Sequence, residues 1–439
     1  MKPNKVKNIL LGKIKELDKA SSDFVTNPEK CFKRNRKLPF SKTLKIILGM
    51  GGGTLSSELL DEYEYSSDAP SPSAFIQQRS KIKPEAFETL FHTFTEGIYR
   101  PNCSDTIPIL AVDGSDIQIA TDPSDEASFF PGTNGQKPYN LLHLNALYDL
   151  SNHLYIDGIL QKARFANEQK AFVDMVDRSP IGKALVIADR GYESYNNLAH
   201  IQEKGWFFLI RIKDGNYGIK GGFDLPDTEE FDKHLNLTLT RKQTKATKEL
   251  IKDKNHYRII SSTTPFDYLP LRSRKHDKTL FYKLSFRIVR FKISDESYET
   301  VITNLDSWDY PADKLKKLYA SRWGIETSFR DLKYTIGLLN FHSKKVMCIQ
   351  QEIFARMIMY NFSEMITLHV VIDNKEKKYT YRANFAVAVR MCRRFFCGKT
   401  TSPNVEAVIA RNLIPIRPDR HRKRNLVNKP FTSFLYRVS

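Results

Sequence analysis

The feature that most restricts the fold of this chain is an alternation of apolar runs and helix-like segments between residues 107 and 212. Three strand-like runs come first, and a helix, a strand, a helix and a strand follow. In chain order the segments are Ile107–Val112, His143–Leu150, His153–Gln161, Phe165–Arg178, Ala184–Ala188, Tyr195–Lys204 and Trp206–Ile212. This order predicts an α/β fold in which helices pack on a mixed sheet.

Two aspartates directly follow apolar runs of this pattern. Asp113 comes after Ile107–Val112, and Asp189 comes after Ala184–Ala188. A glycine follows each within two residues, so each also fits a simple turn at a strand end. Aspartates at the ends of neighbouring strands can equally converge and supply the hard oxygen ligands that divalent cations need at a phosphodiester.

A third acidic residue, Glu326, lies in a segment with helical periodicity that we expect to run without a break from Pro311 to Gly337. At about 100° per residue, Tyr319, Arg322, Glu326 and Lys333 fall on one stripe at the border of an apolar side. One interpretation is a surface ion pair between Arg322 and Glu326, four residues apart. The other is a charged site, because a carboxylate at the edge of a buried face is costly without a charged partner.

The charge of the chain indicates a polyanionic partner. The net charge is +19 and the pI about 9.5, and nucleic acid is the most common partner of such proteins. The excess is concentrated at the two ends, with a net +9 in residues 1–46 and a net +7 in residues 411–439. Both ends are typical of basic arms that bind phosphates, although a solvated surface would have the same composition.

The segments outside residues 107–212 complete the expected layout. Residues 39–100 show several short helices, and Ser73–Ile82 is expected to display Gln78 and Arg79 among other polar side chains. Such a set suits a DNA-reading helical domain, a pattern that many small helical domains share. Residues 213–306 alternate with period two and predict strands, and residues 350–372 and 380–396 predict helices.

The cysteines and the hydropathy of the sequence indicate in which compartment of the cell the protein works. The five cysteines are scattered and include no CxxC pair, which argues against a disulfide framework and a zinc site. We find no signal peptide, and Arg356, Glu364 and His369 interrupt the most apolar segment, so it predicts a core helix and no membrane association. We therefore expect a cytoplasmic protein.

Three blocks of the sequence resemble the motifs of the insertion-sequence 4 (IS4) family of bacterial DDE transposases. The first two are Val112-Asp113-Gly114 and Ala188-Asp189-Arg190-Gly191-Tyr192. The third has the spacing of the family's Tyr/Arg/Glu/Lys motif, with Tyr319, Arg322, Trp323, Ile325, Glu326, Phe329, Leu332 and Lys333 at the matching positions. The similarity runs from about Pro39 to the basic tail.

The resemblance implies an RNase H-like, mixed-sheet catalytic core made of residues 106–212 and 307–400. A β-rich insertion, residues 213–306, would interrupt this core. Residues 1–105 would form a basic, helical DNA-binding region, and a helical C-terminal region would end in a basic tail, residues 401–439.

The resemblance also implies cut-and-paste transposition. Asp113, Asp189 and Glu326 would bind Mg²⁺ or Mn²⁺, two ions per active site, and the enzyme would cut the element ends and join them to target DNA. The partners would be double-stranded DNA, as terminal inverted repeats and as target, and a second copy of the chain, at the bacterial nucleoid.

In the same family, side chains of the third motif hold DNA near the cut end, and an aromatic side chain stacks on a flipped base. The candidates for DNA contact are Tyr319, Arg322, Lys333, Trp323 and Arg190. For stacking, Trp323, Trp308 and Trp206 are candidates that each fit a packing role as well. We expect His143 and His153 to be structural.

Two other functions remain compatible with the sequence. A transposase-derived regulator would bind DNA without cutting it, although it would have no need for three converging carboxylates. A sequence-tolerant nuclease could use the same fold, although the basic ends and the N-terminal helices favour binding to specific DNA ends.

Overall fold

The structure is a computed structural model of the 439-residue chain. The residues described are 1–34, 37–99, 107–133, 135–213, 218–271, 280–294, 297–370, 380–416 and the short strand 435–436. Part of the predicted basic tail, residues 417–434 and 437–439, lies outside them, as does Cys103.

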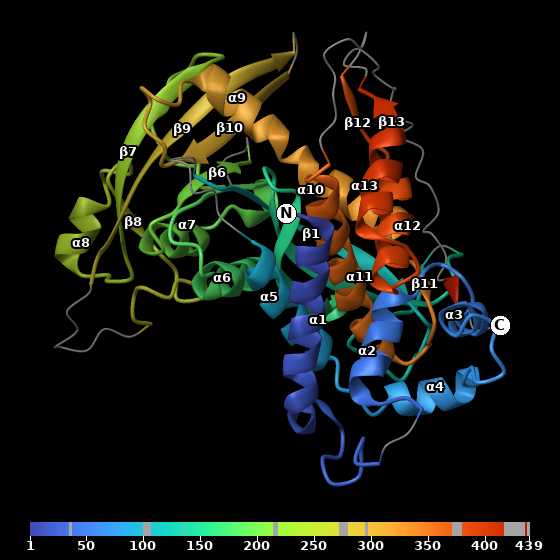
Figure 1. The fold of residues 1–439 in the computed structure, drawn as a ribbon. Coiled ribbons are helices and arrows are strands. Elements are labelled where there is room, and N and C mark those ends of the chain that lie inside the picture. The colour runs from blue at the N-terminus through green and yellow to red at the C-terminus, as the bar shows by residue number, and fades with distance from the viewer. Residues whose placement is uncertain are drawn as a thin grey trace.

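A ten-stranded mixed sheet forms the centre of the molecule (Figure 1). Its strands follow the order β2-β3-β1-β5-β6-β10-β9-β7-β8, and β4 pairs with β3. The strands of the first part are β1 (Ile109–Ile119), β2 (Phe129–Phe130), β3 (Tyr139–Asp149), β4 (Leu154–Lys162), β5 (Leu185–Ala188) and β6 (Phe207–Arg211). Here β3 runs antiparallel to β1 and β4, whereas β1, β5 and β6 run parallel to one another. The predicted mixed sheet and its order of strands and helices are confirmed.

The second part of the sheet comes from the segment predicted to be strand-rich. It consists of β7 (Phe231–Thr240), β8 (Tyr257–Ile259), β9 (Tyr282–Ser294) and β10 (Ser297–Thr303), with the short helix α8 (Lys245–Leu250) between β7 and β8. Since β10 pairs with β6, from Val301 opposite Arg211, these strands continue the same sheet. Figure 1 shows them as one curved side of the molecule, opposite the N-terminal helices.

One strand is longer than the sequence suggested. The expected strand ends at Val112, but β1 continues through Asp113, Gly114, Ser115 and Asp116 to Ile119. The reason is the partner strand, because β3 pairs with β1 residue by residue from Leu110 to Ile119 and satisfies its backbone polar groups. Asp113 therefore lies within a strand, whereas Asp189 follows the last residue of β5 as expected.

The helix expected from Pro311 to Gly337 is divided into three pieces. They are α9 (Ala312–Ser321), α10 (Trp323–Arg330) and a π-helical turn, Asp331–Thr335. The chain tightens at Arg322, whose amide bonds to the carbonyl of Tyr319 at 3.0 Å and whose carbonyl accepts from the amide of Ile325 at 3.1 Å. These three-residue bonds replace the α-helical pattern and separate α9 from α10.

Helices cover the sheet and divide its side chains between two apolar clusters. In β5, Leu185 and Ile187 pack with Leu315 of α9, whereas Val186 and Ala188 face the main core. The helices α6 (Glu168–Arg178) and α7 (Tyr195–Glu203) connect β4, β5 and β6 and add Phe172 to the main core. The alternation along β5 is that of a strand buried on both faces.

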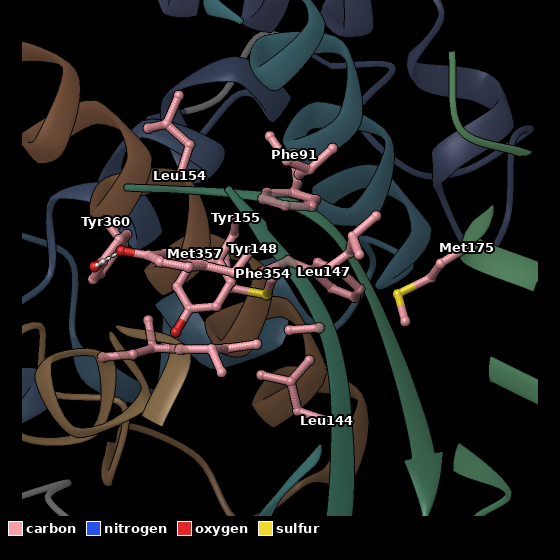
Figure 2. Close-up of a cluster of buried hydrophobic side chains, with 14 of the residues drawn as sticks. Phe91, Leu144, Leu147, Tyr148, Leu154, Tyr155, Met175, Phe354, Met357 and Tyr360 are labelled. Carbon is pink, nitrogen blue, oxygen red and sulfur yellow. Dashed lines mark hydrogen bonds between the residues drawn. The ribbon is translucent and has the colours of Figure 1, made fainter. Parts of the chain in front are cut away.

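The main core is built around α11 (Val346–Thr367), which is buried along most of its length. Figure 2 shows labelled side chains of α5 (Glu85–Ile98), β3, β4, α6 and α11 that belong to this core. Tyr148 of β3 and Tyr360 of α11 share a hydrogen bond of 3.0 Å between their hydroxyls. As predicted, the apolar segment is a core helix, and no described helix is long and apolar enough to cross a bilayer.

The remaining helices gather around α11 and α5. At the N-terminus they are α1 (Pro3–Lys19), α2 (Phe40–Gly49), α3 (Leu55–Glu62) and α4 (Pro72–Arg79). At the C-terminus are α12 (Phe385–Phe396) and α13 (Ser402–Arg411). Four short strands form two small sheets. In one, β11 (Asn340–Phe341) pairs with β14 (Leu435–Tyr436), and in the other, β12 (Tyr381–Ala383) pairs with β13 (Leu413–Pro415).

The N-terminal region contradicts one expectation, the display of Gln78 and Arg79. Residues 3–19 are an amphipathic helix that buries Val6, Leu10 and Ile14, so this part of the basic end is packed on the core. Arg79 and Gln78 of α4 are buried, not displayed. Arg79 pairs with Glu352 of α11 at 2.7 Å, because a charge at this packed contact needs a buried partner.

Candidate active site

Parallel pairing of β1 and β5 places the two aspartates side by side. Ala111 lies opposite Ile187, and the same register continued by two residues sets Asp113 next to Asp189. Each carboxylate also accepts a hydrogen bond from a local amide, that of Gly114 to Asp113 at 2.9 Å and that of Gly191 to Asp189 at 2.8 Å. The sheet therefore fixes the backbone of Asp113 and holds Asp189 just beyond the end of β5, and these amides orient the two side chains.

Glu326 reaches the same place from α10, which packs against β1. Arg322 connects it with Asp113, because its guanidinium pairs with Glu326 at 2.8 Å and lies 3.9 Å from the Asp113 carboxylate. The ion pair expected from the helix alone is present, and it is part of a site between two elements. The structure thus brings together the three predicted acids.

The electrostatics show how closely these groups interact. Burial raises the pKa of Asp113 to about 6, against the hydrogen bond from Gly114 and the charge of Arg322, which lower it. The negative charges of Asp189 and Glu326 raise this pKa further. Converging carboxylates of this kind favour a bound cation, which would relieve their mutual repulsion.

The predicted DNA-contact residues differ in their exposure. Tyr319 is buried and its hydroxyl has no hydrogen-bond partner among the described residues, whereas Arg190 is exposed. Trp323 is 45% exposed, with its ring 5.2 Å from the guanidinium carbon of Arg322. Lys333 donates to the backbone carbonyl of Asp116 at 2.9 Å, and burial lowers its pKa.

The two other tryptophans, Trp206 and Trp308, are at opposite extremes of solvent exposure. Trp206 is buried and donates its indole N–H to the carbonyl of Ile181 at 3.0 Å, so it is a packing residue. Trp308, in the loop before α9, is 91% exposed. Trp206 is therefore removed from the candidates for stacking on a base.

Three polar residues beside these acids were not among the predicted site residues. His143 of β3 lies between two carboxylates, with Nδ1 2.7 Å from Asp116 and Nε2 3.0 Å from Glu168. These carboxylates raise the pKa of His143 to about 9 in spite of its burial. We expected His143 to be structural from its place near a hairpin, and the sequence held no signal for this contact, because it depends on strand pairing and on the position of α6.

Carboxylate oxygens are the ligands that Mg²⁺ and Mn²⁺ prefer, and Asp113, Asp189 and Glu326 fit such an ion by donor chemistry and by charge. In the described residues, no group of three Asp, Glu, His or Cys side chains already has the arrangement of a metal cluster. In this structure, the positive charge next to Glu326 and Asp113 is that of Arg322.

Comparison with known proteins identifies the family. The transposase DDE domain family matches residues 104–362, more than half of the chain. The chain belongs to the IS4 family of DDE transposases. This transposase is 21% identical over 346 residues to the transposase InsG for insertion sequence element IS4 from Escherichia coli strain K12. The alignment covers 75% of this chain and 70% of that protein.

A solved structure gives a more distant likeness. The piggyBac transposase in a synaptic complex with hairpin DNA has a TM-score of 0.46 and 11% sequence identity to this transposase. The alignment covers 96% of this chain and 87% of that chain. The predicted family and the transposase function are thus confirmed by the family match and by the InsG relative.

Proposed function

We propose that this transposase moves an insertion sequence by cut-and-paste transposition, with Asp113, Asp189 and Glu326 as its catalytic residues. The observation that carries the proposal is the convergence of these three acids, from β1, from the end of β5 and from α10, on one half-buried site in which their charges interact. Three such carboxylates are costly to hold together unless they serve a cation.

The three carboxylates would hold Mg²⁺ or Mn²⁺, two ions per site. Bound divalent ions supply Lewis-acid stabilisation of the phosphate and activation of the attacking oxygen. The chain's own residues orient these ligands: the amides of Gly114 and Gly191 position the aspartates, and Arg322 positions Glu326.

Within this proposal the strand order β4-β3-β1-β5-β6, with α6, α7 and α10, corresponds to the RNase H-like core, residues 106–212 and 307–400. Residues 213–306 are the β-rich insertion, 1–105 the DNA-binding region and 401–439 the basic tail. The partners are the terminal inverted repeats and target DNA, with two copies of the chain pairing two DNA ends at the nucleoid.

The DNA contacts belong to the third motif and its surroundings. Lys333 and Arg322 carry the positive charge that phosphates need, and Tyr319 offers a hydroxyl without a partner in the described structure. Arg190 and Trp323 are exposed next to the acids, and Trp323 or Trp308 would stack on an extruded base.

The test is cleavage of a labelled duplex that carries the transposon end, with Mg²⁺ or Mn²⁺, by the wild type and by Glu326→Gln. This substitution keeps the shape of the side chain and removes its charge. We expect the wild type to cut at the end, and we expect the variant to bind the duplex with no detectable cleavage. Asp113→Ala should behave in the same way.

The control is Glu249→Gln, the same change at an exposed position of α8, which should cut like the wild type. If the wild type binds the end without cutting under any metal condition, the protein is a DNA-binding regulator. If it cuts duplexes with and without the inverted repeat equally well, it is a sequence-tolerant nuclease.

A further inference from the structure

We propose that a cavity on the far side of the Glu326 helix binds a small aliphatic amine in its ammonium form. The carboxyl groups of Glu364 and Asp331 are the groups that accept hydrogen bonds from the ammonium nitrogen. The inference concerns a second site of the molecule, and it does not depend on the chemistry at the three acids of the candidate active site.

The cavity lies between α10, α11 and the short strand β12, and its volume is about 550 Å³. Gly324 and Ser328 line it from α10. Both are two residues from Glu326, which places them roughly 160° around the helix from that residue. A space of this size takes a small organic molecule, and a molecule bound there would contact α10 on the side away from the three acids.

The first observation is that Glu364 of α11 lines this cavity without a partner for its carboxyl group. The residue is 8% exposed, and within the described part of the chain its carboxyl group has no hydrogen bond or ion pair to another side chain. Burial, and then the charge of Asp331, raise its pKa to about 8. A buried polar group without a partner is costly, so this position favours a bound group that donates hydrogen bonds.

The second observation is another carboxyl group at the same cavity. Asp331 is half-buried and accepts only a long hydrogen bond of 3.4 Å from the hydroxyl of Thr335. Burial raises its pKa as well. Arg382 of β12 also lines the cavity and its charge acts on Asp331 and Glu364, but among the described residues no ion pair joins it to either. Two carboxyl groups that burial keeps from ionising form a site that a cation completes.

The rest of the cavity wall favours an organic ammonium ion. Tyr148, Tyr360 and Phe385 line the cavity, and Figure 2 shows the two tyrosines side by side in the core. Aromatic rings attract organic cations and pack against methylene groups. A divalent metal ion needs more oxygen or nitrogen ligands than two carboxyl groups supply, and no group of three Asp, Glu, His or Cys side chains in the described residues could hold one.

Binding of the amine should release a proton. At pH 7 the free protein holds a proton on Glu364, whereas an adjacent ammonium group favours the ionised form. Burial lowers the pKa of His153 and raises the pKa values of Tyr148 and Tyr360, so these neighbours stay neutral, and Arg382 is charged like any arginine. The affinity for the amine should therefore increase from about pH 6 to about pH 8, by at most about 10-fold per pH unit.

The test is isothermal titration calorimetry of the full-length protein with 1,4-diaminobutane at pH 7, in two buffers that differ in their ionisation enthalpy. The control compound is 1,4-butanediol, which has the same carbon chain and no charge. We expect the diamine to bind and to release about one proton, measured by the difference in heat between the two buffers. The diol should give no heat beyond that of dilution.

Three variants locate the bound amine. Glu364→Gln keeps the shape of the side chain and removes its ability to ionise, so it should weaken binding by about 10-fold to 100-fold and abolish the proton release. Asp331→Asn should weaken binding and keep the proton release, and it decides the question if Glu364→Gln does not fold. The control Glu249→Gln, on the exposed side of α8, should bind the diamine like the wild type.

Three results would overturn the inference. They are no binding of the diamine by the wild type, binding without proton release, and equal binding by the wild type, Glu364→Gln and Asp331→Asn. The last result would mean that the diamine binds elsewhere on the chain. None of these results bears on the proposed function, because cleavage of the transposon end is measured separately and without the diamine.

Discussion

At the scale of single residues, the motif glycines have a steric role that the sequence motif does not reveal. Gly114 separates Asp113 from Ser115 in the middle of β1, where the backbone is extended and any residue would be tolerated. The restriction comes from the neighbours, since Glu168 and His143 occupy the space that a side chain at this position would take. A glycine here lets the acidic cluster approach the strand closely.

Gly114→Ala should therefore damage the site and the packing together. We expect the free energy of unfolding to fall by about 1–3 kcal/mol, the usual cost of overpacking. Cleavage of the transposon end should fall by about 100-fold, because a shift of the β1 backbone would displace Asp113. Denaturant unfolding and single-turnover cleavage measure the two effects.

Gly182→Ala is the matched control for this prediction. A side chain at Gly182 would contact nothing within 4 Å, so both quantities should stay close to those of the wild type. Wild-type cleavage by Gly114→Ala would show that His143 and Glu168 can move aside without consequence for the chemistry.

At the scale of elements, α11 is unusual because a core helix carries several charged residues. Glu352 is paired with Arg79 and His342, and these partners keep its pKa low, at about 2, in spite of its burial. The carboxyl group of Glu364, three turns further along, has no hydrogen bond or ion pair to another side chain within the described residues. Burial, and then the charge of Asp331, raise the pKa of Glu364 to about 8.

This difference predicts a pH dependence of stability that belongs to Glu364. The folded protein holds a proton on Glu364 up to about pH 8, whereas the unfolded chain releases it near its ordinary pKa of 4.5. The stabilisation is therefore complete at low pH and is lost as the pH rises from about 4.5 to about 8, at no more than about 1.4 kcal/mol per pH unit.

Glu364→Gln should remove this contribution. The variant has a neutral side chain of the same shape, so its free energy of unfolding should fall less between about pH 5 and about pH 8 than that of the wild type. Denaturant unfolding across this range measures the difference, and Glu249→Gln should keep the wild-type profile. Parallel profiles for wild type and Glu364→Gln would mean that Glu364 is ionised in the folded protein.

At the scale of the whole molecule, the N-terminal helices and the sheet that carries the candidate site are joined through α11. Arg79 of α4 binds Gln351 and Glu352, and Arg356 donates to the carbonyl of Gly51 at 2.9 Å. His342, just beyond the Glu326 element, lies 3.2 Å from the carbonyl of Gly53. The glycine-rich loop after α2 is thus a packing junction.

Arg79→Ala should loosen this junction and destabilise the protein. Removal of the arginine leaves Glu352 without one of its buried charged partners, which typically costs about 3–5 kcal/mol. The melting temperature should fall. The variant should lose binding of the transposon end at temperatures above its lowered melting temperature. Lys37→Ala breaks an exposed ion pair with Asp68 and should leave the melting temperature close to that of the wild type. Equal stability of the two variants would contradict the role of Arg79.

Much of the architecture could be predicted from the sequence, because it depends on local patterns. Apolar runs of strand length and the 3.6-residue period of helices identified the elements between residues 107 and 212 and the core helix α11. The motif spacing indicated the family and the three acids. The sequence pattern did not predict where β1 ends, because this depends on pairing with β3. It also did not predict the division of the Glu326 helix at Arg322.

By itself, then, the sequence determined the family and the order of elements, and it predicted Asp113, Asp189 and Glu326 as the site residues. Only the tertiary structure decided which polar residues meet. It buried Arg79 against Glu352, and it brought His143 and Glu168 to the motif glycines from strands and helices that are distant in the chain. The physical reason is that hydrophobic periodicity depends only on residues close together in the sequence. A hydrogen bond or an ion pair between elements depends on strand register and on the angle at which the elements pack.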